Sequence, residues 1–349
     1  MLSGLAGAGT KALGGARFSL VSVVPSAFLV GFVTLLAVSG LYDGRHPHLM
    51  ATIQSLGHNI GWSVVAVFGV FLLAVLLRPF QAAVVQLLEG YWQGIAPFSQ
   101  LRALAVERHR RIQHTALVTM EVEIDPDPLP AQQLREFALR QRQARRRARA
   151  FVKADQRFDR YPRPLTSMNE DGEEVEEERL MPTLLGNVLR DGEDNAGQRY
   201  GLTFQVIAPR LYPALSEKLR NAITQNLDLI DITAAMCVAF AAATVAALPL
   251  IGRWDVWSWL PGGTALLAVL AYRGAIRTAR GHARLLATAV DLHRFDMLTS
   301  LHYRLPVTVQ QERKFNRRLS EFLDSHEPAV DDLRMVRYQH QITDSGPKK

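Results

Sequence analysis

The sequence predicts a mainly α-helical membrane protein with four transmembrane helices, long cytoplasmic helical extensions and a small α+β cytoplasmic insertion. Four apolar stretches contain no charged residue, and a long charged segment separates them into two pairs. Since a helix rises 1.5 Å per residue, about 20 apolar residues cross a hydrocarbon layer roughly 30 Å thick. The four predicted spans are residues 18–42, 60–77, 232–251 and 256–272.

Composition excludes several other classes of protein. Of 349 residues, 48% are hydrophobic and 21% are charged, which rules out a collagenous or wholly disordered chain. Cys237 is the single cysteine, so neither an intramolecular disulfide nor a cysteine-based metal cage can form. The net charge of +7 indicates a bias towards the anionic membrane surface before it indicates nucleic-acid binding.

The first and last apolar stretches have features of their own. The first has 25 uncharged residues, contains Pro25 and lacks a convincing cleavage site, so it is interpreted as a span and not as a signal peptide. The last is the shortest. It opens with Trp257 and Trp259, and the following Pro261-Gly262-Gly263 can loosen its first helical turn.

The distribution of Lys and Arg predicts the orientation. The loops 43–59 and 252–255 contain only Arg45 and Arg253 of the 40 basic residues. The positive-inside rule therefore places both termini and the central segment in the cytoplasm of a multi-pass protein of the inner (plasma) membrane. The expected division is a leader with two spans (1–77), a cytoplasmic domain (78–226), two further spans (227–272) and a cytoplasmic extension with a tail (273–349).

The central segment is expected to form the α+β insertion. An amphipathic helix follows Pro79, and further helices are predicted over 131–158 and 183–199. Alternation of side chains predicts a strand over 115–124, and a second strand is expected over 202–208.

Opposite charges follow one another in the central segment. Eight basic residues lie between 135 and 153, and an acidic run follows at 170–178. The basic helix could bind nucleic acid or anionic lipid, or it could be a solvated helix screened by the acidic run. No aromatic residues are interleaved with the arginines, which disfavours nucleic acid, and screening is the favoured interpretation.

Two helices are expected to continue beyond their spans. From Ser216 no helix breaker appears until Pro249, and from Tyr272 no proline appears until Pro306. The second extension carries a coiled-coil seam, which could pack on the same chain or on another subunit. Its members are Ile276, Ala279, Ala283, Leu286, Val290, His293 and Met297. A last amphipathic helix is predicted through Phe315, Leu319 and Phe322.

A stripe of arginines below the fourth span is the first candidate site. Anionic lipid headgroups would bind such a stripe at roughly 1 kcal/mol per basic residue. Pairing with two aspartates at the start of the third span is the alternative. Both are expected to contribute, with the internal pairing expected for Arg273 or Arg277. The candidates are Arg273, Arg277, Arg280 and Arg284 with Asp228 and Asp231.

His293 on the seam is the second candidate, because Asp291 and Asp296 flank it. A packed histidine can act as a pH-sensitive contact, since imidazole changes its charge near neutral pH. It can also simply hydrogen-bond to Asp296 or to another neighbour, and this second interpretation is favoured.

No catalytic constellation is visible, so no catalytic residue, cofactor or metal is expected. The phosphate-binding G-x-x-x-x-G-K-[ST], the zinc-binding H-E-x-x-H and the nucleophile motif G-x-S-x-G do not occur. His46, His48 and His58 could ligate zinc or copper, but their short loop offers no second shell of supporting groups. If there were a polar pocket, Asn187, Arg190, Glu193 and Asp194 would be the first place to search.

Three stretches of the sequence together carry a resemblance to known proteins. They are Leu77-Arg78-Pro79-Phe80-Gln81 with Leu87-Leu88-Glu89-Gly90-Tyr91-Trp92, Pro182-Thr183-Leu184-Leu185-Gly186-Asn187-Val188-Leu189-Arg190 with Arg199-Tyr200-Gly201, and Val290-Asp291-Leu292-His293-Arg294-Phe295. With these stretches the chain resembles a group of uncharacterised multi-spanning membrane proteins from high-GC Gram-positive (actinobacterial) bacteria. The resemblance covers most of the chain from the second span to His302, and the group has no assigned chemistry that could be transferred.

The expected function is that of a non-enzymatic membrane protein whose cytoplasmic part binds a partner or senses a signal. The alternative is an oligomeric pore or membrane-disrupting effector with a cytoplasmic helical stalk. No span carries a charged residue, which argues against proton-coupled transport. Expected partners are anionic lipid headgroups, a second copy of the chain or a cytoplasmic protein, and nucleic acid is not expected.

Overall fold

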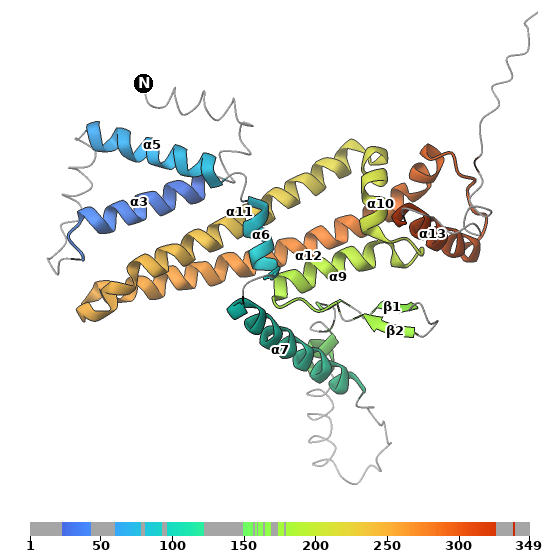
Figure 1. The fold of residues 1–349 in the computed structure, drawn as a ribbon, viewed down its shortest axis with the longest axis horizontal. Coiled ribbons are helices and arrows are strands. Elements are labelled where there is room, and N and C mark those ends of the chain that lie inside the picture. Colours follow the sequence, from blue (N-terminus) through green and yellow to red (C-terminus); the bar gives the residue numbers. More distant parts are fainter. Residues whose placement is uncertain are drawn as a thin grey trace, which may run out of the picture. The chain divides into compact units, whose positions relative to one another are not determined.

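A computed structural model confirms that the chain is mainly helical (Figure 1). The structure describes residues 23–42, 60–77, 81–92, 96–121, 149–155, 158, 160–162, 165–168, 174–177, 179–325 and 338. Several predicted features lie outside these residues: the start of the first span, the loop with His46, His48 and His58, and most of the basic helix and the acidic run.

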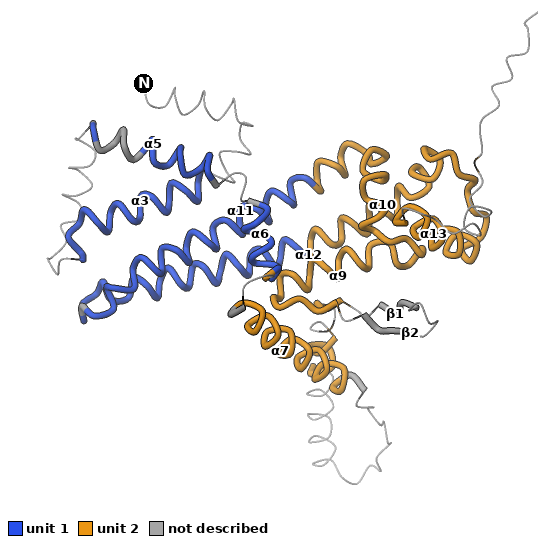
Figure 2. Tube along the Cα trace, viewed as in Figure 1, with its two compact units in different colours: residues 1–91, 224–279 blue, residues 92–223, 280–349 orange. Residues whose placement is uncertain are grey.

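The chain forms two compact units, and each contains two separate segments (Figure 2). Unit 1 consists of residues 1–91 and 224–279, and unit 2 of residues 92–223 and 280–349. Two long helices, α11 (Glu217–Ala247) and α12 (Leu260–Ser300), belong in part to each unit.

Unit 1 contains the apolar helices α3 (Val24–Val38) and α5 (Ile60–Leu77) and the short helix α6 (Gln81–Glu89). Pro25 lies in the first turn of α3, where its missing N–H costs no hydrogen bond. Phe28 meets Phe240 of α11 edge to face at 4.8 Å, and the Tyr42 hydroxyl donates to the carbonyl of Ala246 at 2.9 Å. These contacts fasten α3 to the apolar part of α11.

One helix in the described part of the chain is long and apolar enough to cross a membrane. It covers 36 residues, Glu217–Gly252, and includes most of the 3₁₀ segment Leu248–Arg253 that follows α11. Among the described residues, one of the four predicted spans, 232–251, therefore lies in a helix with the length and composition of a membrane span. The helix α3, the described part of the first predicted span, has 15 residues, about 22 Å. In the fourth predicted span, Val256–Trp259 is 3₁₀ and precedes α12.

The two predicted extensions are confirmed as continuous helices. Helix α11 begins at Glu217, and the carbonyl of the preceding Ser216 accepts the first helical bond, from Arg220 N–H at 3.0 Å. Helix α12 has 41 residues, about 60 Å, and ends at Ser300, before Pro306. Its length follows from the lack of proline between Tyr272 and His302.

The strand predicted over 115–124 is wrong, because α7 (Ala96–Glu121) is helical through residue 121. The alternation of side chains extends over only a short segment, and the helix that precedes this segment continues into it. Thr115 and Thr119 donate to the carbonyls four residues earlier, both at 2.7 Å, which satisfies their hydroxyls inside a helix.

The second predicted strand, 202–208, is also wrong, because α10 (Phe204–Leu211) occupies this segment. Ile207 and Leu211, one helical turn apart, are both buried in the core of unit 2. The structure instead has an antiparallel hairpin of β1 (Leu165–Met168) and β2 (Glu174–Glu177), with Leu165 opposite Glu177.

Helix α9 (Leu184–Gln198) confirms the helix predicted after Pro182. The Thr183 hydroxyl caps it by accepting from Gly186 N–H at 3.0 Å. Gly192 allows a close approach to α12, since a Cβ at this position would lie 2.5 Å from the Cβ of Ala283. The helix ends before Gly201, whose φ of +76° favours glycine.

The core of unit 2 joins α9, α10, α12 and α13 (Val309–Asp324). The seam residues Leu286, Val290 and Met297 are buried in it against residues of the same chain, such as Ile207 and Leu319. In this part of α12 the predicted seam therefore packs intramolecularly, which answers the question that the sequence left open. The amphipathic helix predicted at the C-terminal end is confirmed as α13.

Candidate functional site

The four predicted arginines lie on one face of the continuous helix α12, at successive spacings of four, three and four residues. Arg273, Arg277 and Arg284 are exposed, and Arg280 is half-buried. No ion pair joins Arg273 or Arg277 to Asp228 or Asp231 in the described part of the chain, and the two aspartates are half-buried on α11. The exposed guanidinium groups are thus open to an external anion.

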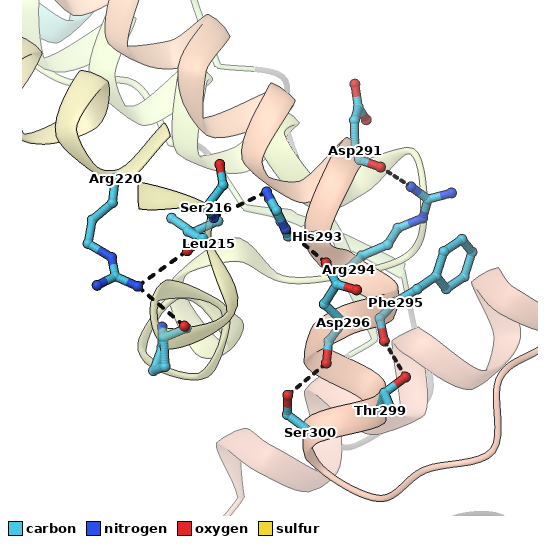
Figure 3. Close-up of polar contacts among 11 residues, drawn as sticks. Leu215, Ser216, Arg220, Asp291, His293, Arg294, Phe295, Asp296, Thr299 and Ser300 are labelled. Atoms are coloured by element: carbon cyan, nitrogen blue, oxygen red, sulfur yellow. Dashed lines mark hydrogen bonds and ion pairs between the residues drawn. The ribbon is translucent and has the colours of Figure 1, made fainter. Parts of the chain in front are cut away.

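The predicted contact of His293 with Asp296 is formed, at the junction between α12 and the start of α11 (Figure 3). The imidazole Nδ1 lies 2.9 Å from Oδ2 of Asp296, and the backbone N–H of Ser216 points to Nε2 at 3.4 Å. The side chain of His293 is 15% exposed and that of Asp296 is 62% exposed. Two segments distant in sequence, α12 and the residue before α11, thereby meet at one histidine ring.

The hydrogen bonds at this junction assign the tautomer of His293. Because Ser216 N–H can only donate, Nε2 must carry a lone pair, and the single ring proton must lie on Nδ1. Nδ1–H then donates to the Asp296 carboxylate. A second proton on Nε2 would remove the acceptor for Ser216 N–H and place two donors face to face, while it would strengthen the pairing with Asp296.

Arg220 also holds the N-terminal end of α11, which Ser216 directly precedes. The Arg220 guanidinium donates through Nη2 to the carbonyls of Leu215 at 3.2 Å and Pro213 at 3.4 Å (Figure 3). It also lies over the ring of Tyr212, 5.6 Å from the centroid. The turn before α11 is therefore fixed by charged and aromatic groups of unit 2.

Asp291, the other predicted neighbour of His293, instead belongs to a cluster that the sequence did not indicate. Its carboxylate accepts from the Tyr200 hydroxyl at 2.8 Å, and Arg294 lies over the Tyr200 ring at 4.0 Å from the centroid. Arg294 Nε donates to Glu312 of α13 at 2.6 Å, where the Glu312 side chain is 6% exposed. Burial, and then the bond to Asp291, raise the pKa of Tyr200. The cluster ties the turn after α9 to α12 and α13.

The four residues singled out as a possible polar pocket do not form one reaction centre. Asn187 is fully buried, and its amide holds the backbone of Met181 and Thr183 through three bonds of 2.8 Å. Glu193 accepts from Gln205 at 3.0 Å. Asn187 thus acts as a clamp on the turn that leads into α9.

Asp194, the most buried carboxylate of that group, forms an ion pair with Arg179 at 3.1 Å. Their side chains are 9% and 12% exposed. Burial raises the pKa of Asp194, and the charges of Arg179 and then Arg190 oppose this shift. No nucleophile accompanies the pair within hydrogen-bond distance in the described residues, so the geometry is that of a structural ion pair.

Among the described residues, no three His, Cys, Asp or Glu side chains converge as a metal site would require. Cys237, the single cysteine, is buried in the apolar part of α11. Comparison of the chain with protein-family models, with curated proteins and with solved structures finds no match.

Proposed function

We propose that this chain is a non-enzymatic integral membrane protein with four spans, whose cytoplasmic unit binds a partner or senses a signal at the membrane surface. The observation that carries the proposal is the continuity of α12. This one helix begins with the apolar residues of the fourth predicted span, continues through the arginine face and reaches the His293 junction without a break.

The arginine face supports a position at the lipid surface. Arg273 and Arg277 directly follow the apolar stretch, are exposed and form no ion pair with the described residues. Guanidinium groups at this place bind anionic headgroups at roughly 1 kcal/mol each, and they oppose movement of the helix into the hydrocarbon.

The His293 junction supports the sensing role. The ring joins the end of one membrane-connected helix, α12, to the first residue before the other, α11. A change at this junction, such as protonation or the docking of a partner, would act on the end of α12 and on the start of α11. The sequence resemblance to uncharacterised multi-spanning actinobacterial membrane proteins agrees with this proposal and adds no chemistry to it.

Cysteine accessibility tests the topology on which the proposal depends. In a Cys237→Ala background, Gly252→Cys and Ser300→Cys each place one thiol at an exposed position; a Cβ at Gly252 meets no atom within 4 Å. A membrane-impermeant maleimide should label Gly252→Cys in intact cells and Ser300→Cys only after permeabilisation. Labelling of both positions in intact cells, or recovery of the protein in the soluble fraction after alkaline extraction, would contradict the proposal.

Native mass spectrometry with retained lipid separates this function from the alternative of an oligomeric pore. The burial of Leu286, Val290 and Met297 by the same chain leaves this part of the seam without a free face for other subunits. A monomer or dimer is expected. A closed ring of four or more subunits would favour the pore.

A further inference from the structure

The outward face of α13 carries a groove of about 530 Å³ that the proposed function does not use. Its described lining comes from this one helix and consists of four cations, one amide and one carboxylate. The lining residues are Gln310, Arg313, Lys314, Arg317, Arg318 and Glu321. Concave sites for small ligands have volumes of roughly 300–1,000 Å³, so the groove has room for a ligand larger than a single phosphate ion.

The four cations form no ion pair with any residue that the structure describes. Other arginines of unit 2 do so: Arg111 with Glu107 at 2.9 Å, Arg179 with Asp194 at 3.1 Å and Arg294 with Glu312 at 2.6 Å. Carboxylates elsewhere in this unit pair with arginines, whereas Glu321, the one carboxylate in the described lining of the groove, forms no ion pair with its four cations.

The spacing of these cations works against the helix itself. Arg313 and Arg317, and likewise Lys314 and Arg318, are four residues apart, where like charges destabilise a helix. All four fall within about 7.5 Å of helix rise. A bound anion would remove this repulsion between the four cations. A face in contact with water alone would keep the repulsion and gain nothing in return.

The one acidic residue within the first turns of α13 does not relieve this repulsion, because it points inward. Glu312 is buried and accepts from Arg294, so its charge is already neutralised. The inner face is fixed further by Asn316, which donates to the Tyr200 carbonyl at 3.0 Å, and by Ser320, which accepts from Thr203 N–H at 3.1 Å. The helix is therefore held in place with its cations outward, which lowers the ordering cost of binding an anion.

We propose that this groove binds a ligand with two or more adjacent phosphate groups. Three of the four cations are arginines, whose planar forks match phosphate oxygens in bidentate geometry. Each phosphate group carries up to about two negative charges, so a diphosphate or triphosphate matches four cations in one small volume, whereas a carboxylate supplies one charge. The ligand is either a soluble phosphate compound or a phosphorylated lipid headgroup. This inference stands whether or not the proposed membrane function holds.

The test is a calorimetric titration of inorganic tripolyphosphate into the full-length protein in phosphatidylcholine nanodiscs. The double variant Arg313→Gln/Arg317→Gln should bind at least about tenfold more weakly, because two charge-assisted contacts are lost. The double variant Arg110→Gln/Arg111→Gln removes the same charge from exposed positions of α7 and should change the affinity by less than about twofold. Unchanged circular dichroism and melting temperature verify that the variants fold.

Nanodiscs of phosphatidylglycerol distinguish the two sources of phosphate. If headgroups fill the groove, the native protein and the Arg313→Gln/Arg317→Gln variant should bind tripolyphosphate with nearly equal affinity in these discs. If the natural ligand is soluble, the tenfold ratio should persist. The proposal fails if tripolyphosphate does not bind saturably, if both double variants weaken it equally, or if only a single-stranded oligonucleotide binds.

Discussion

Asn187 shows how one buried side chain can organise a helix entrance. Its amide oxygen accepts from the N–H of Met181, and its amide nitrogen donates to the carbonyls of Met181 and Thr183. These backbone groups lie in the segment before α9, and the Thr183 carbonyl also accepts a helical bond from Asn187 N–H at 3.1 Å. The side chain of Asn187 therefore ties the segment that leads into α9 to the first turn of the helix.

Replacing Asn187 by Ala should destabilise unit 2 by about 2–4 kcal/mol, because buried backbone groups would lose their partners. The measurement is the melting temperature in mild detergent followed by circular dichroism. Asn195→Ala on the same helix is the matched control. Asn195 is exposed and bonds only to Asp191, so its loss should cost less than about 0.5 kcal/mol. Equal effects of both variants would contradict the assigned role of Asn187.

At the scale of elements, the buried ion pair of Arg294 and Glu312 fastens α13 to α12. The two side chains are 15% and 6% exposed, and Arg294 is also sandwiched between the rings of Tyr200 and Phe295. Removing one of these two side chains leaves a buried charge without its partner, which strongly lowers the free energy of unfolding. Removing both charges together lowers it much less.

A double-mutant cycle tests this fastening. Arg294→Met alone should destabilise the protein by about 3–5 kcal/mol, because Glu312 would remain buried without a counter-charge. The double variant Arg294→Met/Glu312→Gln should recover a large part of this loss. Arg110→Met, which removes an exposed arginine next to Glu107, is expected to leave the melting temperature unchanged. Strictly additive effects of the two changes would rule out a coupled pair.

The attachment of α7 is expected to depend on pH through His109. Its Nδ1 lies 3.0 Å from the Tyr161 hydroxyl, and burial lowers the pKa of His109 below its ordinary value of 6.5, with Arg108 acting in the same direction. The unfolded chain then binds the proton more readily than the folded chain. The contribution of neutral His109 to the free energy of unfolding is complete above about pH 6.5. It is lost as the pH falls through the lower pKa that His109 has in the folded chain.

Unfolding measured between pH 5 and 8 checks this expectation. The native protein should lose stability towards the acidic end, and His109→Gln should flatten the dependence. His114→Gln, at an exposed position of the same helix, should leave the slope as it is in the native protein. Burial also lowers the pKa of His282, so some slope should remain after His109 is replaced. A slope that His109→Gln leaves intact would refute the assignment.

At the scale of the whole molecule, the apolar character of α11 decides whether the protein inserts into a membrane. Ala241 is exposed near the centre of the apolar stretch 232–251. An aspartate at the centre of a spanning helix costs roughly 2.5–3.5 kcal/mol on insertion scales, whereas on a water-exposed helix it would cost little. Ala241→Asp should therefore lower the fraction of protein that resists alkaline extraction from membranes. Gln225→Asp, at an exposed position of α11 outside the apolar stretch, should leave that fraction unchanged. Equal extraction of both variants would argue that α11 does not span.

The sequence by itself determined the features that depend on neighbouring residues along the chain. The lack of proline after Tyr272 predicted α12, the segment 183–199 was predicted as the helix found as α9, and apolar spacing predicted α13, because helices are stabilised by contacts within one or two turns. The contact of His293 with Asp296 was visible for the same reason, since the two residues are one turn apart.

Tertiary structure decided what depends on residues far apart in sequence. The segments 115–121 and 202–208 alternate like strands, but helical continuity in the first and burial of Ile207 and Leu211 in the second outweighed that local pattern. Glu312 points inward because Arg294, 18 residues away, neutralises it, and this leaves four cations and one carboxylate, Glu321, around the groove on the outer face of α13. No periodicity along the chain encodes such pairings, since they arise only when separate helices bury their polar groups against one another.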